Sequence, residues 1–358
     1  MPNLEIAHQR LFNLSISQPT FETPQEAVGW LVASQAQDYA GAKWALGLRM
    51  RGASDEALDR AFAKGDILRT HVMRPTWHFV TPADIRWMLA LTGPRVHTTN
   101  VSMSRKLGLD EDVLRRSNAV MARTLQGGNQ LTREELQDAL RADGIVTDPS
   151  LRLIYLLMYA ELEGVICSGA RRGKQFTYAL LDERAPNARM LGREEALAEL
   201  AGRYFVSRGP ATVQDFAKWS GLTLADARRG LEAVKSRLRE EVIDSQSYWL
   251  PDSTPSAKND VPVAHLLSIY DEYISSYKNR SAIGTAEVGT TLMAMGNDLT
   301  YLILMDGLIV GTWKRTLGKT SVEIRTNLFR SLTEAEDHAL KLAAERYGEF
   351  LGLSVVLS

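Results

Sequence analysis

GPATVQDFAKWSGLTLADARRGLEAVKSRL, residues 209–238, contains two helix starts separated by a tight turn. TVQD begins the first helix and TLAD begins the second, because a threonine followed three residues later by a carboxylate caps a helix N-terminus. The glycine of SGL suits the turn between them. EEVIDSQSYWL, residues 240–250, then predicts a two-stranded hairpin. A short helix, a tight turn, an amphipathic helix and a hairpin are typical of a winged helix-turn-helix unit.

The same order of elements occurs earlier in the chain. LTREELQDAL (131–140) opens on a Thr132/Glu135 capping box, and residues 148–164 form a strongly apolar helix ended by glycine. VICSGARRGKQFTYALL (165–181) predicts a strand, a basic turn flanked by glycines, and a second strand. The capping boxes at Thr132 and Thr212 lie about 80 residues apart, which indicates tandem units.

The N-terminal segment also predicts helices followed by a hairpin. TPQE (23–26) places a capping threonine before a proline, and we expect the helix to run from there toward Ala36. Further helices are expected at 40–48 and 54–64, and a hairpin at 67–80 with its turn at MRPT.

The C-terminal part changes character after PDSTPSAKNDVP (251–262), a polar linker. Residues 263–280, 301–316 and 321–329 predict mainly strands, and TEAEDHALKLAAERYGEFLG (333–352) predicts a helix before the short strand LSVVL. We therefore expect a separate α+β, barrel-like domain.

The whole chain is thus predicted to be mainly α with α+β elements: tandem winged-helix units plus a β-rich C-terminal domain. Its 358 residues suit roughly two to four domains. The predicted divisions are 1–110, 111–190, 191–252 and 260–358.

Composition narrows the function. Hydrophobic residues make up 45% and charged residues 24%, as in globular proteins. The single cysteine excludes a disulfide framework, and the opening residues lack the pattern of a signal peptide, so we expect a cytoplasmic protein without a membrane span. The net charge of −1 argues mildly against a nucleic-acid partner. Basic residues nevertheless cluster locally, and each cluster is either a solvated face or part of a DNA-binding surface.

Several chemistries lack their motifs. There is no G-x-x-x-x-G-K-[ST], G-x-G-x-x-G or G-x-S-x-G sequence, and the six histidines show no metal-ligand spacing. We expect neither metal nor cofactor. Asp271 and Glu272 in YDEY are either catalytic carboxylates or acceptors for nearby tyrosine or arginine donors.

Gln35 and Gln37 are long amides in an otherwise apolar segment. In an ideal helix, residues two apart point about 200° away from each other. A shared site therefore requires the helix to end near them, which the following DYAG allows. Alternatively, one glutamine caps backbone carbonyls while the other faces solvent.

Four phrases together resemble the AlkZ-like (AlkZ/YcaQ) family of bacterial winged-helix DNA glycosylases. They are SQAQDYAGAKWALGLR (34–49), RTHVMRPTWHFV (69–80), YDEYISSYKNRSA (270–282) and GLIVGTWKRT (307–316). The resemblance implies a C-shaped scaffold of tandem winged helices. It also implies a catalytic Gln-hydrophobic-Gln motif at Gln35, Ala36 and Gln37, of the type found in the crosslink-unhooking branch. The implied partner is double-stranded DNA with alkylated or crosslinked purines, with no obligate protein partner.

The chemistry of two amides fits that implication. Glutamine is no general base near neutral pH, but its carbonyl oxygen can orient water and face a developing positive charge. This help suffices when the leaving base is already cationic, as in N7-alkylguanine or N3-alkyladenine. We therefore expect a monofunctional glycosylase with little pH dependence near neutrality and poor activity on ordinary bases.

Further candidates surround the motif. Arg49, Thr76, Trp77 and His78 are predicted to line a lesion cleft, although Trp77 is equally well a core residue. The GARRGK turn is either a DNA-contacting wing or a solvated turn, and Trp313 is expected to pack. The candidate DNA contacts, which include Arg49 again, are Arg74, Arg171, Arg172, Lys174, Tyr277, Lys278, Arg280, Lys314 and Arg315.

The sequence leaves two other functions open. One is a non-enzymatic winged-helix protein that regulates genes or masks lesions. The other is a metal-dependent nuclease that uses Asp271 and Glu272. A lyase is not expected, because Lys43 is the only lysine near the motif.

Overall fold

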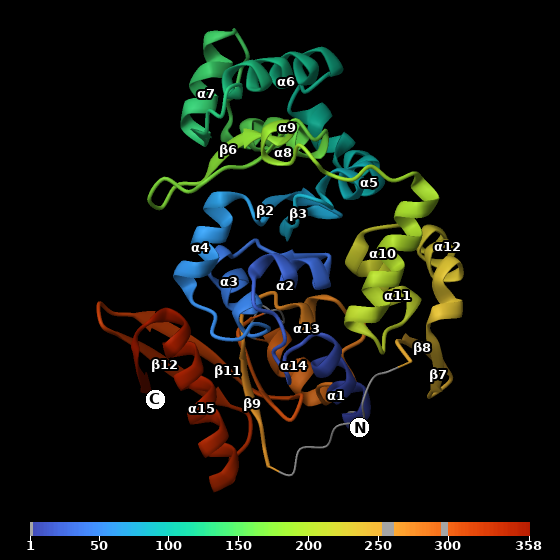
Figure 1. Ribbon diagram of the computed structural model, residues 1–358, viewed down its shortest axis with the longest axis vertical. Helices are drawn as coiled ribbons and strands as arrows, with labels where there is room; N and C mark the ends of the chain where they lie inside the picture. The colour runs from blue at the N-terminus through green and yellow to red at the C-terminus, as the bar shows by residue number, and fades with distance from the viewer. Residues whose placement is uncertain (1–2, 253–260, 295–299) are drawn as a thin grey trace.

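The computed structural model describes residues 3–252, 261–294 and 300–358 (Figure 1). Residues 253–260 of the predicted linker at 251–262 lie outside these residues. The N-terminal part contains helices α1 to α4 and a sheet with the strand order β1-β3-β2. Its elements are α1 (Leu4–Asn13), α2 (Pro24–Leu31), β1 (Ala33–Gln35), α3 (Tyr39–Gly47), α4 (Asp55–Lys64), β2 (Leu68–Val72) and β3 (Arg74–Val80).

The first predicted helix is shorter than expected. The Thr23 capping box is confirmed, but α2 ends at Leu31. Val32 caps its C-terminus with a φ of 65°, in the left-handed region that β-branched residues seldom adopt. The chain then enters β1, so the expectation that a helix reaches Ala36 was wrong. The extended segment places Gln35 in a strand.

The second unit stands at the top of Figure 1, above β2 and β3. The predicted capping box at Thr132 and the strand-turn-strand after Gly164 are confirmed. The hydrophobic cores of α6, α7 and α8 meet in one cluster of their own. Its elements, with the long α5 that leads into it, are α5 (Ile85–Lys106), α6 (Glu111–Leu125), β4 (Leu131–Thr132), α7 (Arg133–Ala142), α8 (Ser150–Leu162), β5 (Ile166–Ser168), β6 (Thr177–Leu180) and α9 (Leu181–Arg184).

The third unit confirms the elements expected from residues 209–250. Thr212 and Thr223 each accept a hydrogen bond from the backbone three residues on, and Gly221 ends the first helix with a φ of 72°. A side chain at Gly221 would collide with the carbonyl of Met73, so this turn packs closely against the first unit. The elements are α10 (Arg193–Arg208), α11 (Val213–Ser220), α12 (Leu224–Val234), the 3₁₀ turn η1 (Lys235–Arg237), β7 (Arg239–Ile243) and β8 (Gln246–Leu250).

The C-terminal part forms a five-stranded sheet with the order β13-β12-β11-β10-β9, covered by α15. Among the described strands, β9 and β13 are both edges, so the barrel-like expectation becomes an open, curled sheet (Figure 1). Residues 263–280 are a strand only at the start, and Asp271 of YDEY caps a short helix that begins at Glu272. The elements are β9 (Ala264–Leu267), α13 (Glu272–Ser275), α14 (Ala286–Ala294), β10 (Leu302–Met305), β11 (Leu308–Leu317), β12 (Ser321–Leu328), α15 (Glu334–Leu351) and β13 (Ser354–Leu357).

One large hydrophobic core joins the first unit, the third unit and the C-terminal sheet. Trp44 of α3 packs on Tyr347 and Phe350 of α15, and its indole N–H donates to the Leu266 carbonyl. The helix-rich architecture is confirmed, while the four-domain division stays a prediction. No helix in the described part of the chain combines the length and the apolarity that crossing a bilayer requires.

Candidate active site

Gln35 and Gln37 project from an extended segment rather than from a helix. Successive side chains of a strand alternate between its faces, so residues two apart share a face. Gln35, the last residue of β1, is half-buried, Ala36 is buried, and Gln37, which lies just beyond the strand, is exposed. A helix would have pointed the two side chains away from each other, and this segment is not helical. Both amides can therefore act on one bound group.

The backbone of the motif is held on both edges. The Gln35 N–H donates to Glu272 Oε1 at 2.9 Å, and the Ala36 N–H donates to the Trp77 carbonyl at 2.7 Å. The Ala36 carbonyl accepts from Arg69 Nε at 2.9 Å. Side chains on a fixed backbone lose less conformational freedom when they bind, which is how preorganised sites gain precision.

Glu272 anchors the motif to the third unit. Its Oε2 lies 2.9 Å from Arg208 Nη2 and 2.9 Å from Trp219 Nε1, and it also accepts from Ser276 Oγ at 2.7 Å. Burial alone would raise the pKa of Glu272, but the Arg208 guanidinium and these hydrogen bonds lower it to about 2. The carboxylate is therefore ionised, fully paired and unsuited to act as a general base.

Both carboxylate oxygens of Asp271 are also engaged. It makes a two-pronged ion pair with Arg49, both contacts at 2.9 Å, and neither side chain is exposed. The prediction that Asp271 and Glu272 accept from nearby arginine donors is confirmed. Both carboxylates are engaged, so they are not available as metal ligands for the alternative nuclease. Arg49 is likewise a core residue, so its assignment to the lesion cleft and to DNA was wrong. Its guanidinium has no exposure with which to reach a phosphate.

A polar cluster shares the face of the glutamines. Gln35 pairs with His78, and His78 pairs with Thr70, across the sheet β1-β3-β2. Directly opposed side chains lie on one face of an antiparallel pair. Thr76 and Arg74 precede His78 in β3, where the pairing with β2 is irregular, and the charge of Arg74 acts on His78. Within the described residues, buried polar atoms of this cluster lack partners: Thr70 Oγ1, Arg74 Nε and Nη2, Thr76 Oγ1 and His78 Nε2.

Burial sets the charge states in this cluster. Burial, as the larger cause, and the neighbouring Arg74 cation together lower the pKa of His78 to about 3. His78 is therefore neutral at physiological pH. Burial also lowers the pKa of Arg74, whereas Glu272 raises it. His78 is fully buried and is the cross-strand neighbour of Gln35, and its place in the lesion cleft stays a prediction.

The other face of the sheet joins the second unit. Arg69 is sandwiched between the rings of Trp77 and Phe176, at 4.2 Å and 4.5 Å from their centroids. Arg171 lies 4.9 Å from the ring of Tyr39, and the loop before β6 extends toward α4 in Figure 1. Trp77 is thus partly a packing residue, because its ring supports the arginine that holds the Ala36 carbonyl.

The remaining basic candidates are divided between surface and core. Lys174, Lys278 and Lys314 are exposed. Arg172 is exposed but pairs with Glu135 at 2.6 Å, and Arg280 is half-buried with Nε on the Ile274 carbonyl.

Beside the motif, Asp38 lies 3.5 Å from the Tyr301 hydroxyl. The half-buried Arg315 lies 5.8 Å from that tyrosine ring and donates to the Tyr347 hydroxyl. Arg315 therefore sits close to the glutamine motif, but its guanidinium is already partly engaged.

Tyr277 was wrongly expected to contact DNA. It has no exposed surface, its hydroxyl donates to the Arg208 carbonyl at 2.8 Å, and Arg10 stacks on its ring at 3.6 Å. Trp313, by contrast, is buried as expected and donates to the Leu267 carbonyl.

Sequence reasoning missed the residues that hold the motif. Arg69, Arg208 and Trp219 lie in three different elements, and no spacing relates them to Gln35. The one available signal was chemical: YDEY places two carboxylates in an aromatic segment, where buried charges need cationic partners.

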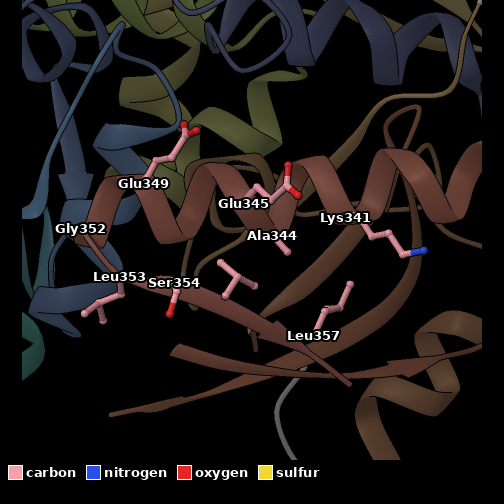
Figure 2. A pocket seen from close by; sticks show the side chains of 9 residues that line it. Lys341, Ala344, Glu345, Glu349, Gly352, Leu353, Ser354 and Leu357 are labelled. Carbon is pink, nitrogen blue, oxygen red and sulfur yellow. The ribbon is translucent and has the colours of Figure 1, made fainter. Parts of the chain in front are cut away.

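Two features of the described residues bear on phosphate and metal binding elsewhere in the chain. A hollow of about 560 Å³ lies between α15 and β13, and its lining includes Lys341, Glu345 and Glu349, of which the two glutamates point away from Lys341 (Figure 2). The lining carries two glutamates against one lysine, and this negative charge does not suit phosphate. Among residues 3–252, 261–294 and 300–358, no three His, Cys, Asp or Glu side chains form a group that could hold a metal ion.

These features define a helix-rich protein with helix-turn-helix and hairpin units around a preorganised pair of neutral amides. A model of the family described as DNA glycosylase AlkZ-like matches residues 28–350, so the chain belongs to this family. It is 25% identical over 319 residues to an interstrand DNA cross-link repair glycosylase of Streptomyces sahachiroi, covering 86% of this chain and 85% of the relative. The solved structure of the Streptomyces sahachiroi DNA glycosylase AlkZ shares the fold, with a TM-score of 0.82, 21% identity and full coverage of both chains.

Proposed function

We propose that this protein is a monofunctional, metal-independent DNA glycosylase that hydrolyses the N-glycosidic bond of N-alkylpurines with a formal positive charge. The observation that carries the proposal is the position of Gln35 at the end of a strand held by hydrogen bonds, with the exposed Gln37 two residues further on. The nearest buried carboxylate, Glu272, is turned to the backbone and to Arg208. Neutral amides are thus the groups that the motif offers to a substrate.

The proposed reaction needs only modest help from the protein. The bond from C1′ to the base nitrogen breaks with its electron pair going to the base, which neutralises the alkylated purine. Between them, the amide oxygens of Gln35 and Gln37 accept a hydrogen bond from water and face the positive charge that develops on the sugar. The water oxygen then bonds to C1′, and its proton passes to solvent.

Interstrand crosslinks are a proposed substrate alongside N7-alkylguanine monoadducts. The name of the Streptomyces sahachiroi relative supports this extension. We further propose that the helix-and-hairpin units act as tandem winged helices that hold duplex DNA in a C-shaped arrangement, in the bacterial cytosol and without an obligate protein partner.

The proposed DNA contacts follow from exposure and position. Arg74 is a strong candidate, because its buried guanidinium has unpartnered N–H groups and phosphate accepts such donors. Arg49 and Tyr277 are not among the proposed contacts, because both are fully buried. The contacts that remain are Arg74, Arg171, Arg172, Lys174, Lys278, Arg280, Lys314 and Arg315.

Removing exposed lysines beside the site should weaken DNA binding without changing the chemistry. We expect Lys278→Ala with Lys314→Ala to reduce the slope of log affinity against log salt by roughly 0.9 per lost phosphate contact. Fluorescence anisotropy at several salt concentrations measures this slope. Lys341→Ala, an exposed lysine on α15, is the matched control and should leave the slope unchanged. An unchanged slope in the double variant would remove these lysines from the DNA interface.

The glycosylase proposal is tested by incubating the protein with a duplex that contains 7-methylguanine, in the presence of EDTA. Free 7-methylguanine and an alkali-labile site in the strand are the expected products. Binding without release of base would favour a regulator or lesion-masking protein. Strand cleavage that EDTA abolishes would instead favour a metal-dependent nuclease.

A further inference from the structure

His78 carries an acceptor atom that the protein leaves without a partner. Its Nδ1 lies 3.0 Å from the Thr76 carbonyl oxygen, which can only accept, so Nδ1 carries the proton. Nε2 then has a free lone pair. It is buried and has no hydrogen-bond partner among the described residues. Buried polar atoms are nearly always satisfied, in many cases by ordered water.

The position of this atom ties it to the motif. His78 is the direct cross-strand neighbour of Gln35, and such pairs have Cβ atoms about 4.5–5.5 Å apart on one face. The Gln35 side-chain amide makes no hydrogen bond within the described residues. A water between the two side chains would therefore have two acceptors, the Gln35 amide oxygen and His78 Nε2, and the unpartnered hydroxyl of Thr70, the other cross-strand neighbour of His78, lies on the same face.

We propose that His78 is a second acceptor for the attacking water, which it holds together with Gln35. This inference rests on the proposed glycosylase function and adds a catalytic residue to it. The water donates one hydrogen to Gln35 and the other to His78, which aims its oxygen lone pair at C1′. The oxygen bonds to C1′ after the cationic base has left with the bond's electron pair, and the surplus proton passes to solvent.

His78 orients this water and does not take its proton. Three charged or titratable groups act on its imidazole: Arg74 and His71 disfavour protonation and Glu272 favours it. Burial dominates and keeps the ring neutral. The role therefore differs from general-base catalysis, in which the acceptor's pKa would lie near the working pH.

The test compares two isosteric replacements in single-turnover release of 7-methylguanine. Asparagine places its amide near the Nδ1 position and removes the Nε2 acceptor, whereas glutamine extends an oxygen to the Nε2 position. We expect His78→Asn to slow release at least about tenfold with unchanged DNA affinity, and His78→Gln to recover activity relative to His78→Asn. His265→Asn is the matched control. It removes another buried imidazole, whose pKa burial likewise lowers to about 3, from a distant sheet.

A second readout separates water positioning from general damage to the fold. In mixtures of methanol and water, a held water should exclude methanol, so wild type should form little methyl glycoside. His78→Asn should form more, and His265→Asn should match wild type. Equal rates and equal methanol incorporation in His78→Asn and wild type would overturn the inference while the glycosylase proposal stands. A wild-type protein that releases no 7-methylguanine would overturn both.

Discussion

Simultaneous replacement of Gln35 and Gln37 by alanine is expected to abolish release of 7-methylguanine while DNA affinity stays nearly intact. Gln35 ends a strand and Gln37 lies two residues beyond it, in a segment whose backbone is held by Glu272, Trp77 and Arg69. Preorganised groups of this kind are worth about 10²–10³ in rate when one is removed. Removing both should leave little beyond spontaneous depurination. Single-turnover assays with a saturating excess of protein measure the effect.

The glutamine variant should fold normally. Gln37 is exposed and makes only a weak contact of 3.4 Å with the Trp77 N–H, and the backbone contacts of Gln35 do not involve its side chain. Gln25→Ala with Gln246→Ala is a matched control, because both residues are exposed and lie in α2 and β8, away from the motif. Full activity in the Gln35/Gln37 variant would refute the assignment of the motif.

Replacement of Glu272 by alanine is expected to have the largest effect on stability. It leaves Arg208 as an unpaired charge with no exposed surface, which costs about 3–5 kcal/mol in comparable buried pairs. It also frees the Gln35 N–H and the Trp219 indole N–H from their shared acceptor. We therefore expect a lower unfolding midpoint in urea and slower base release in any protein that remains folded.

The Glu272 ion pair also predicts a direction of pH dependence. Its pKa is lowered from the model-compound value of 4.5 to about 2 in the folded protein. A lowered carboxyl pKa stabilises the folded state above the unfolded value, and this stabilisation is lost as the pH falls from about 4.5 toward 2. Urea unfolding of wild type should show this loss. The same experiment on Glu272→Ala should show a smaller slope, and equal slopes would contradict the assignment.

Local sequence signals predicted the elements of the fold well. The capping boxes at Thr132 and Thr212 and the glycine turn at Gly221 depend on neighbours within a few residues, and all three are confirmed. The end of α2 was missed, because nothing local marks Val32 as a residue with positive φ. Tertiary contacts of β1 with β3 decide that position.

The site was predictable only in its outermost residues. Gln35 and Gln37 stood out because long amides are unusual in an apolar segment. Their supports come from Arg69, Arg208 and Glu272, whose contacts with the motif span 33 to 237 residues of sequence. Only a folded chain brings these groups together.

The prediction that Arg49 contacts DNA was wrong because it depended on the charge of the residue alone. The residue ends an apolar helix segment, WALGLR, and its fixed partner Asp271 lies 222 residues away. A cation within a buried face indicates an internal ion pair more strongly than it indicates DNA. Tyr277 was also wrongly expected to contact DNA, and its neighbours in YISSY are all buried.

The central claim is that two neutral amides restrict catalysis to bases already made cationic by alkylation. The most direct test is the rate of base release by wild type from two matched duplexes, one with 7-methylguanine and one with neutral 8-oxoguanine. Between about pH 6 and pH 9 we expect nearly pH-independent release of 7-methylguanine and no release of 8-oxoguanine. Comparable release of 8-oxoguanine would require a group that protonates the leaving base, and it would contradict this account.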